Sequence, residues 1–208
     1  MAVISNKKKL CFIHIHRTGG GTITELLNQQ VNDLLITPYL HSTLFNTIKC
    51  NPIVEEYTKF AFVRNPYDWI ISLYSSAIDP AYQNKDYKEV KNMSLYTFVE
   101  WIHDVGMKRE EKKYSNFYRT QTDFLHINNK LAVDMIYQYE GMCNDGDTSN
   151  LYSLFLNLNL YMPKTVPLLN KSERPFNYIE LFDNKTLKLV NKIFKDDFIN
   201  FNYKMNEL

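Results

Sequence analysis

The stretch that decides the fold is Leu10-Cys11-Phe12-Ile13-His14-Ile15-His16-Arg17-Thr18-Gly19-Gly20-Gly21-Thr22. Its first six residues form a short, almost continuous apolar run, which is typical of a buried strand in a parallel sheet. Three glycines follow, and from Thr22 to Val31 the apolar residues recur at helical spacing. The stretch therefore predicts a strand, a tight loop and a helix in direct succession.

Similar units are predicted further along the chain. Strands are expected at residues 34–36, 59–64 and 131–137. Helices are expected at residues 67–76, from the cap Ser94 to Gly106, at 149–160, and from the cap Asp183 through Phe194. Loops are expected at residues 79–92, 141–150 and 163–175. Strands that alternate with helices predict an α/β fold with a central parallel sheet, in a single domain over residues 1–208.

Composition narrows the class of protein. The chain has 208 residues, 45% of them hydrophobic, and a formal net charge of only +1, so bulk electrostatic binding of nucleic acid is not expected. Its three cysteines, Cys11, Cys50 and Cys143, are odd in number and none lie at metal-ligand spacing. No apolar run reaches the length of a membrane span. We expect a cytoplasmic chain, although a trimmed lumenal domain of an anchored enzyme would share these features; nothing points to one oligomeric state.

The glycine-rich loop has the chemistry of an anion site. Glycines let the backbone approach a ligand and turn its N–H groups inward, and the following helix adds the positive end of its dipole. Arg17 and the hydroxyls of Thr18 and Thr22 add donors. The alternative is a tight turn that needs glycines only for its shape. The loop is not a Walker A motif, because Gly21-Thr22 lacks the intervening lysine.

A second candidate site is Arg64-Asn65-Pro66-Tyr67-Asp68-Trp69-Ile70-Ile71-Ser72. Arg64 closes a predicted strand, and ligands of open α/β sheets bind at that carboxyl edge. Asn65 is expected to cap the next helix, with Pro66 at its first position. Ser72 lies about two helical turns on and is able to share an anion with Arg64. The alternative is a structural arginine paired with a carboxylate, and a serine on a helix face.

Together the two motifs resemble a known family. The segment Phe12–Gly20 resembles the 5′-phosphosulfate loop of carbohydrate-type and bacterial sulfotransferases, and Phe62–Tyr74 resembles their 3′-phosphate motif. Weaker similarities continue along the chain, at His41-Ser42-Thr43, Val133–Ile136 with Glu140, Asn170-Lys171-Ser172 and Lys195–Tyr203. The sequence departs from the family pattern at four positions, where His16 replaces a proline, Arg17 a lysine, Gly21 a threonine and Trp69 an arginine.

The resemblance implies a P-loop-like, three-layer α/β fold with helices on both sides of the sheet. It also implies transfer of the sulfuryl group of 3′-phosphoadenosine-5′-phosphosulfate (PAPS) to an acceptor hydroxyl, expected on a carbohydrate, leaving adenosine 3′,5′-bisphosphate. The residues expected to bind PAPS are Arg17, Thr18, Gly19, Gly20, Gly21, Thr22, Arg64, Ser72, Lys171 and Arg174. Lys171 and Arg174 stand in a basic loop that either closes over the nucleotide or is simply a solvated charged loop.

The expected catalytic residues are Arg17 and His41. Arg17, the loop N–H groups and the helix terminus stabilise charge on the leaving phosphate, so no metal is required. His41 has the intrinsic pKa of a base near neutrality and follows the predicted strand 34–36. A capping histidine before a helix is the alternative for His41, and Asp33 and Glu25 are the alternative bases.

Two other functions share the predicted scaffold. A P-loop kinase for a nucleoside or small molecule would use the same anion loop, but the sequence lacks its lysine and a clear magnesium-binding aspartate. A non-catalytic module that binds a nucleotide or glycan would bind without turnover.

Overall fold

The computed structural model describes residues 1–37, 42–82, 86–106, 118–143, 146–167 and 178–206. The chain divides into two compact units. The sheet unit comprises Met1–Arg64 and Ser115–Asn170, and the helical unit comprises Asn65–Tyr114 and Lys171–Leu208.

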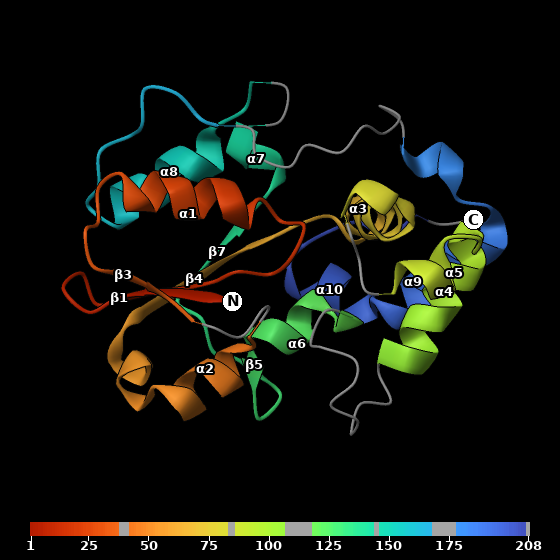
Figure 1. Ribbon diagram of the computed structural model, residues 1–208, viewed down its shortest axis with the longest axis horizontal. Coiled ribbons are helices and arrows are strands. Elements are labelled where there is room, and N and C mark those ends of the chain that lie inside the picture. The colour runs from red at the N-terminus through yellow and green to blue at the C-terminus, as the bar shows by residue number, and fades with distance from the viewer. Residues whose placement is uncertain (38–41, 83–85, 107–117, 144–145, 168–177, 207–208) are drawn as a thin grey trace. The chain divides into compact units, whose positions relative to one another are not determined.

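The sheet unit is built on a five-stranded sheet in the order β3-β1-β2-β4-β7 (Figure 1). Its strands are β1 (Ala2–Ser5), β2 (Leu10–Ile13), β3 (Leu34–Ile36), β4 (Thr58–Val63) and β7 (Met135–Gln138). β2, β4 and β7 are parallel, whereas β1 is antiparallel to both β2 and β3. The expected parallel sheet is therefore a mixed one, in which β1 alone runs against the other four strands.

The difference arises at the N-terminus, where β1 was not predicted. The lysines after β1 form the exposed turn of a β1–β2 hairpin, and Lys9 adopts a positive φ of 50°. Asp33 braces this turn, because its carboxylate accepts hydrogen bonds from the Ser5 hydroxyl at 2.6 Å and the Lys7 amide at 2.8 Å. A four-residue strand in front of a lysine run carries too little periodicity to be recognised from sequence.

Helices lie on both faces of this sheet. Figure 1 shows α1 (Gly20–Asn28), α7 (Glu140–Cys143) and α8 (Ser149–Asn157) on one face, and α2 (Leu44–Cys50) and α6 (Gln121–Leu125) on the other. The predicted three-layer arrangement of helices around a sheet is therefore present in this unit.

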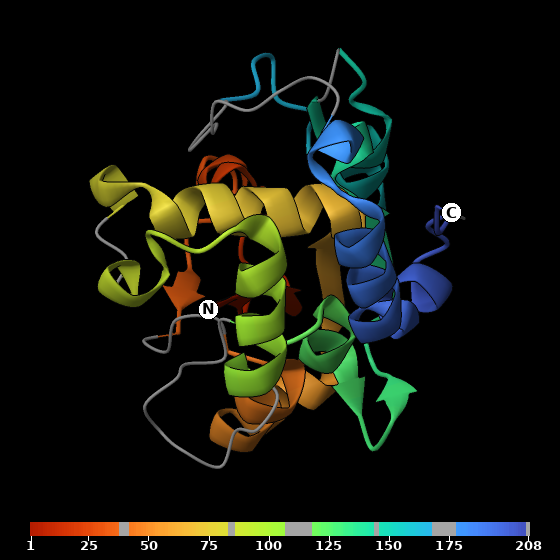
Figure 2. The same ribbon diagram turned by 90° about the vertical axis from the view of Figure 1, so that its right-hand side faces the viewer.

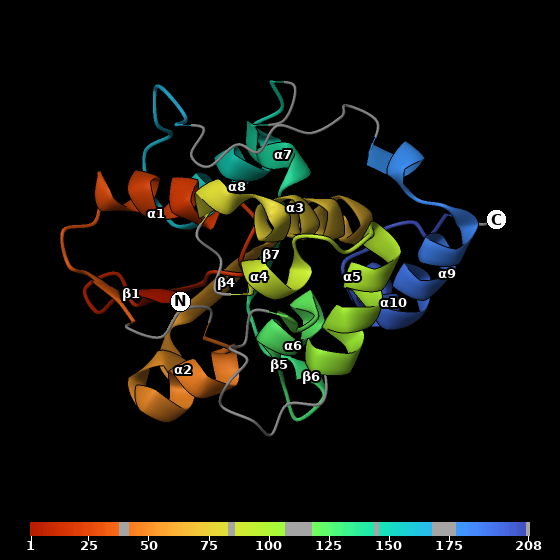
Figure 3. The same cartoon turned by 45° about the vertical axis from the view of Figure 1, so that its right-hand side comes forward.

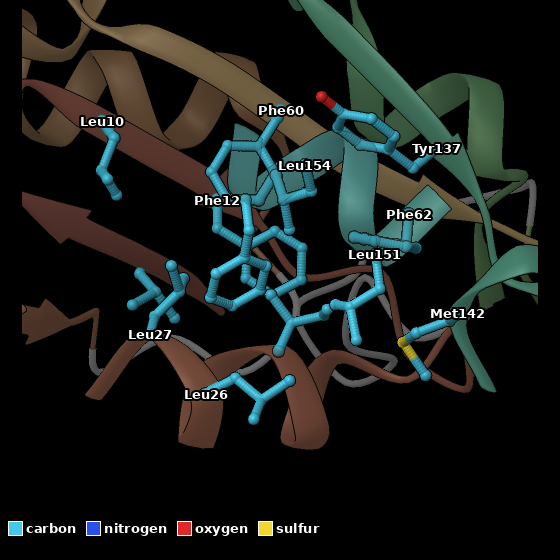
Figure 4. Close-up of a cluster of buried hydrophobic side chains, with 13 residues drawn as sticks. Leu10, Phe12, Leu26, Leu27, Phe60, Phe62, Tyr137, Met142, Leu151 and Leu154 are labelled. Carbon is cyan, nitrogen blue, oxygen red and sulfur yellow. The ribbon is translucent and has the colours of Figure 1, made fainter. Parts of the chain in front are cut away.

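The core under α1 and α8 is a single apolar cluster (Figure 4). Its members come from the sheet and from α1, α7 and α8, and all are nearly inaccessible to solvent. They are Val3, Leu10, Phe12, Ile23, Leu26, Leu27, Phe60, Phe62, Tyr137, Met142, Leu151, Leu154 and Phe155. Phe12 stacks on Phe60 with ring centroids 5.1 Å apart. Because truncating a buried leucine or phenylalanine usually costs about 2–5 kcal/mol, this cluster holds α1 firmly on the sheet.

Two predicted boundaries in this unit shift for local reasons. The strand expected at 131–137 is divided between β6 (Lys130–Leu131), which pairs with β5 (His126–Ile127) in a separate hairpin, and β7 (Figure 2). Asn128 and Asn129 form the hairpin turn with φ of 51° and 60°, which asparagine tolerates. The loop expected at 141–150 contains the short helix α7 and the start of α8.

The helical unit contains the predicted helices with their predicted caps. Asn65, Ser94 and Asp183 each accept a hydrogen bond from a backbone N–H of the following helix. The elements are α3 (Pro66–Ile78), α4 (Tyr87–Val90), α5 (Leu95–Trp101), α9 (Asn184–Ile193) and α10 (Lys195–Asn200), with short helical turns at Pro80–Tyr82, Ile102–Gly106 and Tyr178–Leu181. α5 packs against both α3 and α9 (Figure 3). The prediction of an exposed loop at 79–92 is wrong in part, because α4 forms there and buries Val90.

Aromatic side chains form the core of the helical unit. Tyr67 packs against Phe182 and Phe198 with ring centroids 5.5 and 4.9 Å apart, and its hydroxyl accepts from the Asn206 amide at 2.9 Å. Trp69 meets Phe194 edge-on at 5.8 Å and is 1% exposed. These contacts tie the first turn of α3 to α9, α10 and the C-terminal segment.

Candidate anion-binding site

The glycine loop, defined here as residues 14–19, joins β2 to α1 in the sheet unit. Gly19 is the N-cap of α1 with φ of 80°, and it has no side chain with which to cap the helix. Arg17 also has a positive φ, 62°. A non-glycine residue in this region costs of order 1 kcal/mol and is uncommon outside turns and functional sites. The loop therefore holds a strained arginine in front of a helix end that carries no side-chain cap.

Two of the three glycines are also required by packing. A Cβ on Gly20 would lie 1.9 Å from Cδ2 of His14, and one on Gly19 would lie 2.3 Å from Cε of Met142. His14 in turn stacks on Phe12 with ring centroids 5.8 Å apart, as a residue of the core would. The shape explanation for the glycines therefore holds at both positions, so the case for an anion must rest on the charges and amides around them.

The loop threonines donate their hydroxyl hydrogens within the chain. Thr18 Oγ1 donates to the Ile15 carbonyl and Thr22 Oγ1 to the Pro167 carbonyl, both at 2.8 Å. A hydroxyl has one hydrogen to donate. In this conformation the two hydroxyls stabilise the loop, and the groups of these residues that are able to bind an anion are their backbone N–H groups.

Arg64 links the two sequence motifs. It follows β4, is 3% exposed, and donates from Nη1 to the Arg17 carbonyl at 2.8 Å. Its guanidinium lies 4.3 Å from the ring centroid of Tyr139, within the range of a cation–π contact. Two arginines 47 residues apart thus meet at the carboxyl edge of β2 and β4. Burying a guanidinium is costly unless partners compensate it, and the Arg17 carbonyl and the Tyr139 ring are two such partners.

Other predicted site residues are found in different places. Ser72 is fully buried in α3 of the helical unit, and its predicted partnership with Arg64 stays a prediction. His41, Lys171 and Arg174 lie outside the described residues. Thr37, the last described residue before His41, bonds through its hydroxyl and amide to Ala2 at the same sheet edge as the glycine loop.

The alternative bases are not at the loop. Asp33 is beside Ser5 and Lys7, at the edge where β2 begins, which is the opposite edge of the sheet. Hydrogen bonds from the Ser5 hydroxyl and the Lys7 amide hold the pKa of this carboxyl below its ordinary value. Asp33 is therefore a turn residue, and the expectation that it is an alternative base is wrong. Glu25 is exposed on α1.

Two departures from the family pattern now have structural explanations. His16 is 2% exposed and meets Phe124 edge-on at 5.6 Å. Trp69, which stands where the resemblance places an arginine, is a core residue of the helical unit. Both side chains are buried and pack edge-on against a phenylalanine ring.

Sequence reasoning missed two neighbours of Arg64. Gln121 binds the Arg64 backbone, and Tyr139 lies under its guanidinium. Tyr139 comes directly after β7 and two positions past the end of the predicted strand 131–137, so the rule that ligands bind at strand ends could have indicated it. Gln121 had no such signal, because it is contributed by a short helix 57 residues away.

Within the described ranges, no group of three or more histidine, cysteine or acidic side chains is arranged to hold a metal ion. No helix in the same ranges has the length and apolar character needed to cross a membrane.

Comparison with known proteins identifies the family. The sequence profile of the sulfotransferase family matches residues 1–204 of the 208. The chain belongs to the sulfotransferase family. No curated protein and no solved structure matches it.

Sulfotransferases generally take their sulfuryl group from PAPS, which carries a 5′-phosphosulfate and a 3′-phosphate. The chemistry of the donors in this sulfotransferase fits such a ligand. The nine-residue helix α1 presents its N-terminus without a side-chain cap, and two arginines bound to each other through the Arg17 carbonyl lie at the same edge.

Proposed function

We propose that the chain transfers the sulfuryl group of PAPS to an acceptor hydroxyl, releasing adenosine 3′,5′-bisphosphate. The observation that carries the proposal is the hydrogen bond from Arg64 Nη1 to the Arg17 carbonyl. It joins the two motifs that the family resemblance assigns to the two phosphates of one nucleotide. An arginine with only a structural role in one motif would not have to contact the other motif. The contact between the two motifs therefore supports a ligand that both of them bind.

In this proposal the glycine loop and the first turn of α1 bind the 5′-phosphosulfate. Backbone N–H groups of Thr18 to Thr22 and the guanidinium of Arg17 are the donors. Arg64, together with Ser72, binds the 3′-phosphate, and Lys171 with Arg174 closes over the nucleotide. The Tyr139 ring, with its centroid 4.3 Å from the Arg64 guanidinium, helps to hold that guanidinium in place through a cation–π contact.

PAPS supplies a sulfur atom bonded to a good leaving group, its own 5′-phosphate. In the reaction the acceptor oxygen forms a bond to sulfur while the bond from sulfur to the phosphate oxygen breaks, and the electron pair stays on the phosphate. Arg17 and the amides of the loop stabilise this growing negative charge. His41 accepts the proton of the acceptor hydroxyl. No metal is needed in this scheme, because the donors of the chain supply the positive charge.

The acceptor is proposed to be a carbohydrate hydroxyl, on the strength of the carbohydrate-type resemblance of both motifs. An alcohol is a poor nucleophile until its proton is removed, which agrees with a histidine base. The proposal includes the cytoplasmic location expected from the sequence.

A thermal-shift experiment separates this function from its alternatives. Adenosine 3′,5′-bisphosphate without magnesium should raise the unfolding temperature, since a ligand at 100 times its Kd adds about 2.7 kcal/mol of stability. Stabilisation by Mg-ATP alone would instead favour a kinase. Consumption of PAPS with a panel of sugars, read by mass spectrometry of the sulfated product, then distinguishes an enzyme from a module that only binds.

A further inference from the structure

Gln121 makes two hydrogen bonds to the backbone of a single residue, Arg64. The Arg64 N–H donates to Gln121 Oε1 at 2.8 Å, and Gln121 Nε2 donates to the Arg64 carbonyl at 2.8 Å. The Gln121 side chain is fully buried. Its amide therefore pairs with the Arg64 backbone as a neighbouring strand would.

This pairing takes over where the sheet ends. The ladder between β4 and β7 stops at Val63 opposite Gln138, followed by one bond from the Tyr139 amide to the Val63 carbonyl. On the other side, pairing with β2 stops at Ala61. Arg64 is buried yet lies beyond both ladders, and buried backbone groups need partners. Gln121 supplies the acceptor and the donor at once.

The supporting helix is itself fixed at its start. Thr120 caps α6 by accepting from the Asp123 amide at 3.1 Å, and the Asp123 carboxylate accepts from the Thr120 amide at 3.2 Å. This reciprocal capping box holds the first turn, where Gln121 stands. Gln121 is thus presented from a rigid element.

We propose that Gln121 is a positioning residue of the nucleotide site. By fixing the Arg64 backbone it fixes the direction in which the guanidinium leaves the sheet, and that guanidinium in turn holds the Arg17 carbonyl. Gln121 touches no ligand and acts through Arg64 on both phosphate subsites. The inference rests on the proposed function for the identity of the ligand, but its geometry belongs to the chain alone.

The test replaces Gln121 by methionine, which has a similar volume and makes neither bond. The matched control is Leu125→Ala on the same helix. Leu125 is also fully buried, but its side chain has no donor or acceptor with which to bond the Arg64 backbone. Isothermal calorimetry should show that Gln121→Met lowers the affinity for adenosine 3′,5′-bisphosphate roughly 10-fold more than the affinity for adenosine 5′-phosphate. This is the fold-change expected from the loss of about one charge-assisted hydrogen bond. Leu125→Ala should leave the ratio of the two affinities unchanged.

Equal weakening of both nucleotides by Gln121→Met, or an unchanged affinity, would overturn the inference. If Gln121→Met does not fold, Gln121→Glu takes its place; it retains the acceptor for the Arg64 amide and loses the donor to its carbonyl. A smaller shift of the affinity ratio in the same direction supports the inference, and an unchanged ratio overturns it.

Amide hydrogen exchange without ligand keeps the inference separate from the proposed function. If the wild-type chain binds neither nucleotide, the proposed function fails, and exchange still decides the role of Gln121. Faster exchange at Arg64 and in the glycine loop in the Gln121 variant than in Leu125→Ala supports the positioning role. Equal exchange in the two variants overturns it.

Discussion

Two junctions between a strand and a helix carry the two arginines of the candidate site, Arg17 and Arg64, and they are built in opposite ways. The junction from β2 to α1 has positive φ at Arg17 and Gly19, and its N-cap has no side chain. The junction from β4 to α3 has Asn65 as N-cap, whose side chain accepts from the Tyr67 amide at 3.1 Å, and Pro66 follows.

The difference indicates how each junction is able to bind an anion. At the first, no side chain caps the helix start, so its backbone amides are able to bind an anion. At the second, the helix caps itself, so any binding depends on the side chain before it, Arg64. One nucleotide would then be held by backbone amides at one phosphate and by a guanidinium at the other. The following substitutions test that division of roles.

The largest effect is expected at a third strand end. β3 runs in the same direction as β2, and His41 follows it in the chain. If His41 is the general base, His41→Ala should lower kcat by roughly 10²–10⁴ and leave nucleotide affinity nearly intact. Because a protonated imidazole accepts no proton, the acid limb of the pH–rate profile should vanish in the variant. Wild-type kcat and an unchanged limb would place the base elsewhere.

At the first junction, Arg17→Ala should lower kcat by roughly 10²–10³, the usual loss when one donor to developing charge is removed. Affinity for adenosine 3′,5′-bisphosphate should fall less, because the charge on the leaving phosphate grows only as the reaction proceeds. Steady-state kinetics and calorimetry measure the two quantities. Arg17→Lys, which restores the residue of the family pattern, is the matched variant and should retain most of the activity. An unaffected kcat in Arg17→Ala would contradict the role.

At the second junction, Arg64→Ala should weaken binding of the bisphosphate more than binding of adenosine 5′-phosphate, which lacks the 3′-phosphate. A hydrogen bond to a charged group contributes about 1.5–3 kcal/mol, a ratio of roughly 10- to 150-fold. Binding of both nucleotides by calorimetry gives that ratio. Since Arg64 also holds the Arg17 carbonyl, some loss of adenosine 5′-phosphate affinity is expected too. Equal losses for both nucleotides would reduce Arg64 to a support for the loop.

Much of the fold was readable from local patterns. The caps Asn65, Ser94 and Asp183 were predicted because each has a side-chain acceptor before a helical pattern, and capping depends only on residues one turn apart. The strands 34–36 and 59–64 were predicted to within one residue of β3 and β4, because short apolar runs are also a local signal. β1 was missed because it gains its stability from two neighbouring strands, which its own four residues do not reveal.

The candidate site was readable in its parts and not in its assembly. Sequence indicated Arg17 and Arg64, but their contact depends on which strands are neighbours in the sheet. Gln121 became visible only once those strands were paired, whereas Tyr139, just past a strand end, could have been indicated from the sequence. Asp33 was misjudged because proximity to the loop in sequence does not decide at which sheet edge a residue lies.

A smaller effect is expected from Gly19, the N-cap of α1. Gly19 and Gly146 both have positive φ, 80° and 85°, so Gly→Ala at either should cost about 1–2 kcal/mol of stability through the backbone. Only at Gly19 would the new Cβ also meet Met142 and Tyr139, whereas nothing lies within 4 Å of one at Gly146. Gly19→Ala alone should therefore weaken nucleotide binding as well. Equal nucleotide affinity in the two variants would mean that the first junction is only a turn.

The smallest effect is expected from the cap of the second junction. Asn65→Ala removes the acceptor of the Tyr67 amide and should lower the free energy of unfolding by about 1 kcal/mol, measured by denaturant titration. Asn65→Asp keeps an acceptor at the same position and should retain that stability, with the added benefit of a negative charge near the helix start. If α3 is capped by its own chain and offers no helix end to the nucleotide, Asn65→Asp should leave affinity for the bisphosphate close to wild type. A strong loss of affinity in Asn65→Asp, with stability intact, would mean that the new carboxylate repels a bound phosphate there. In that case both junctions would present their helix ends to the ligand, and the contrast between them would not hold.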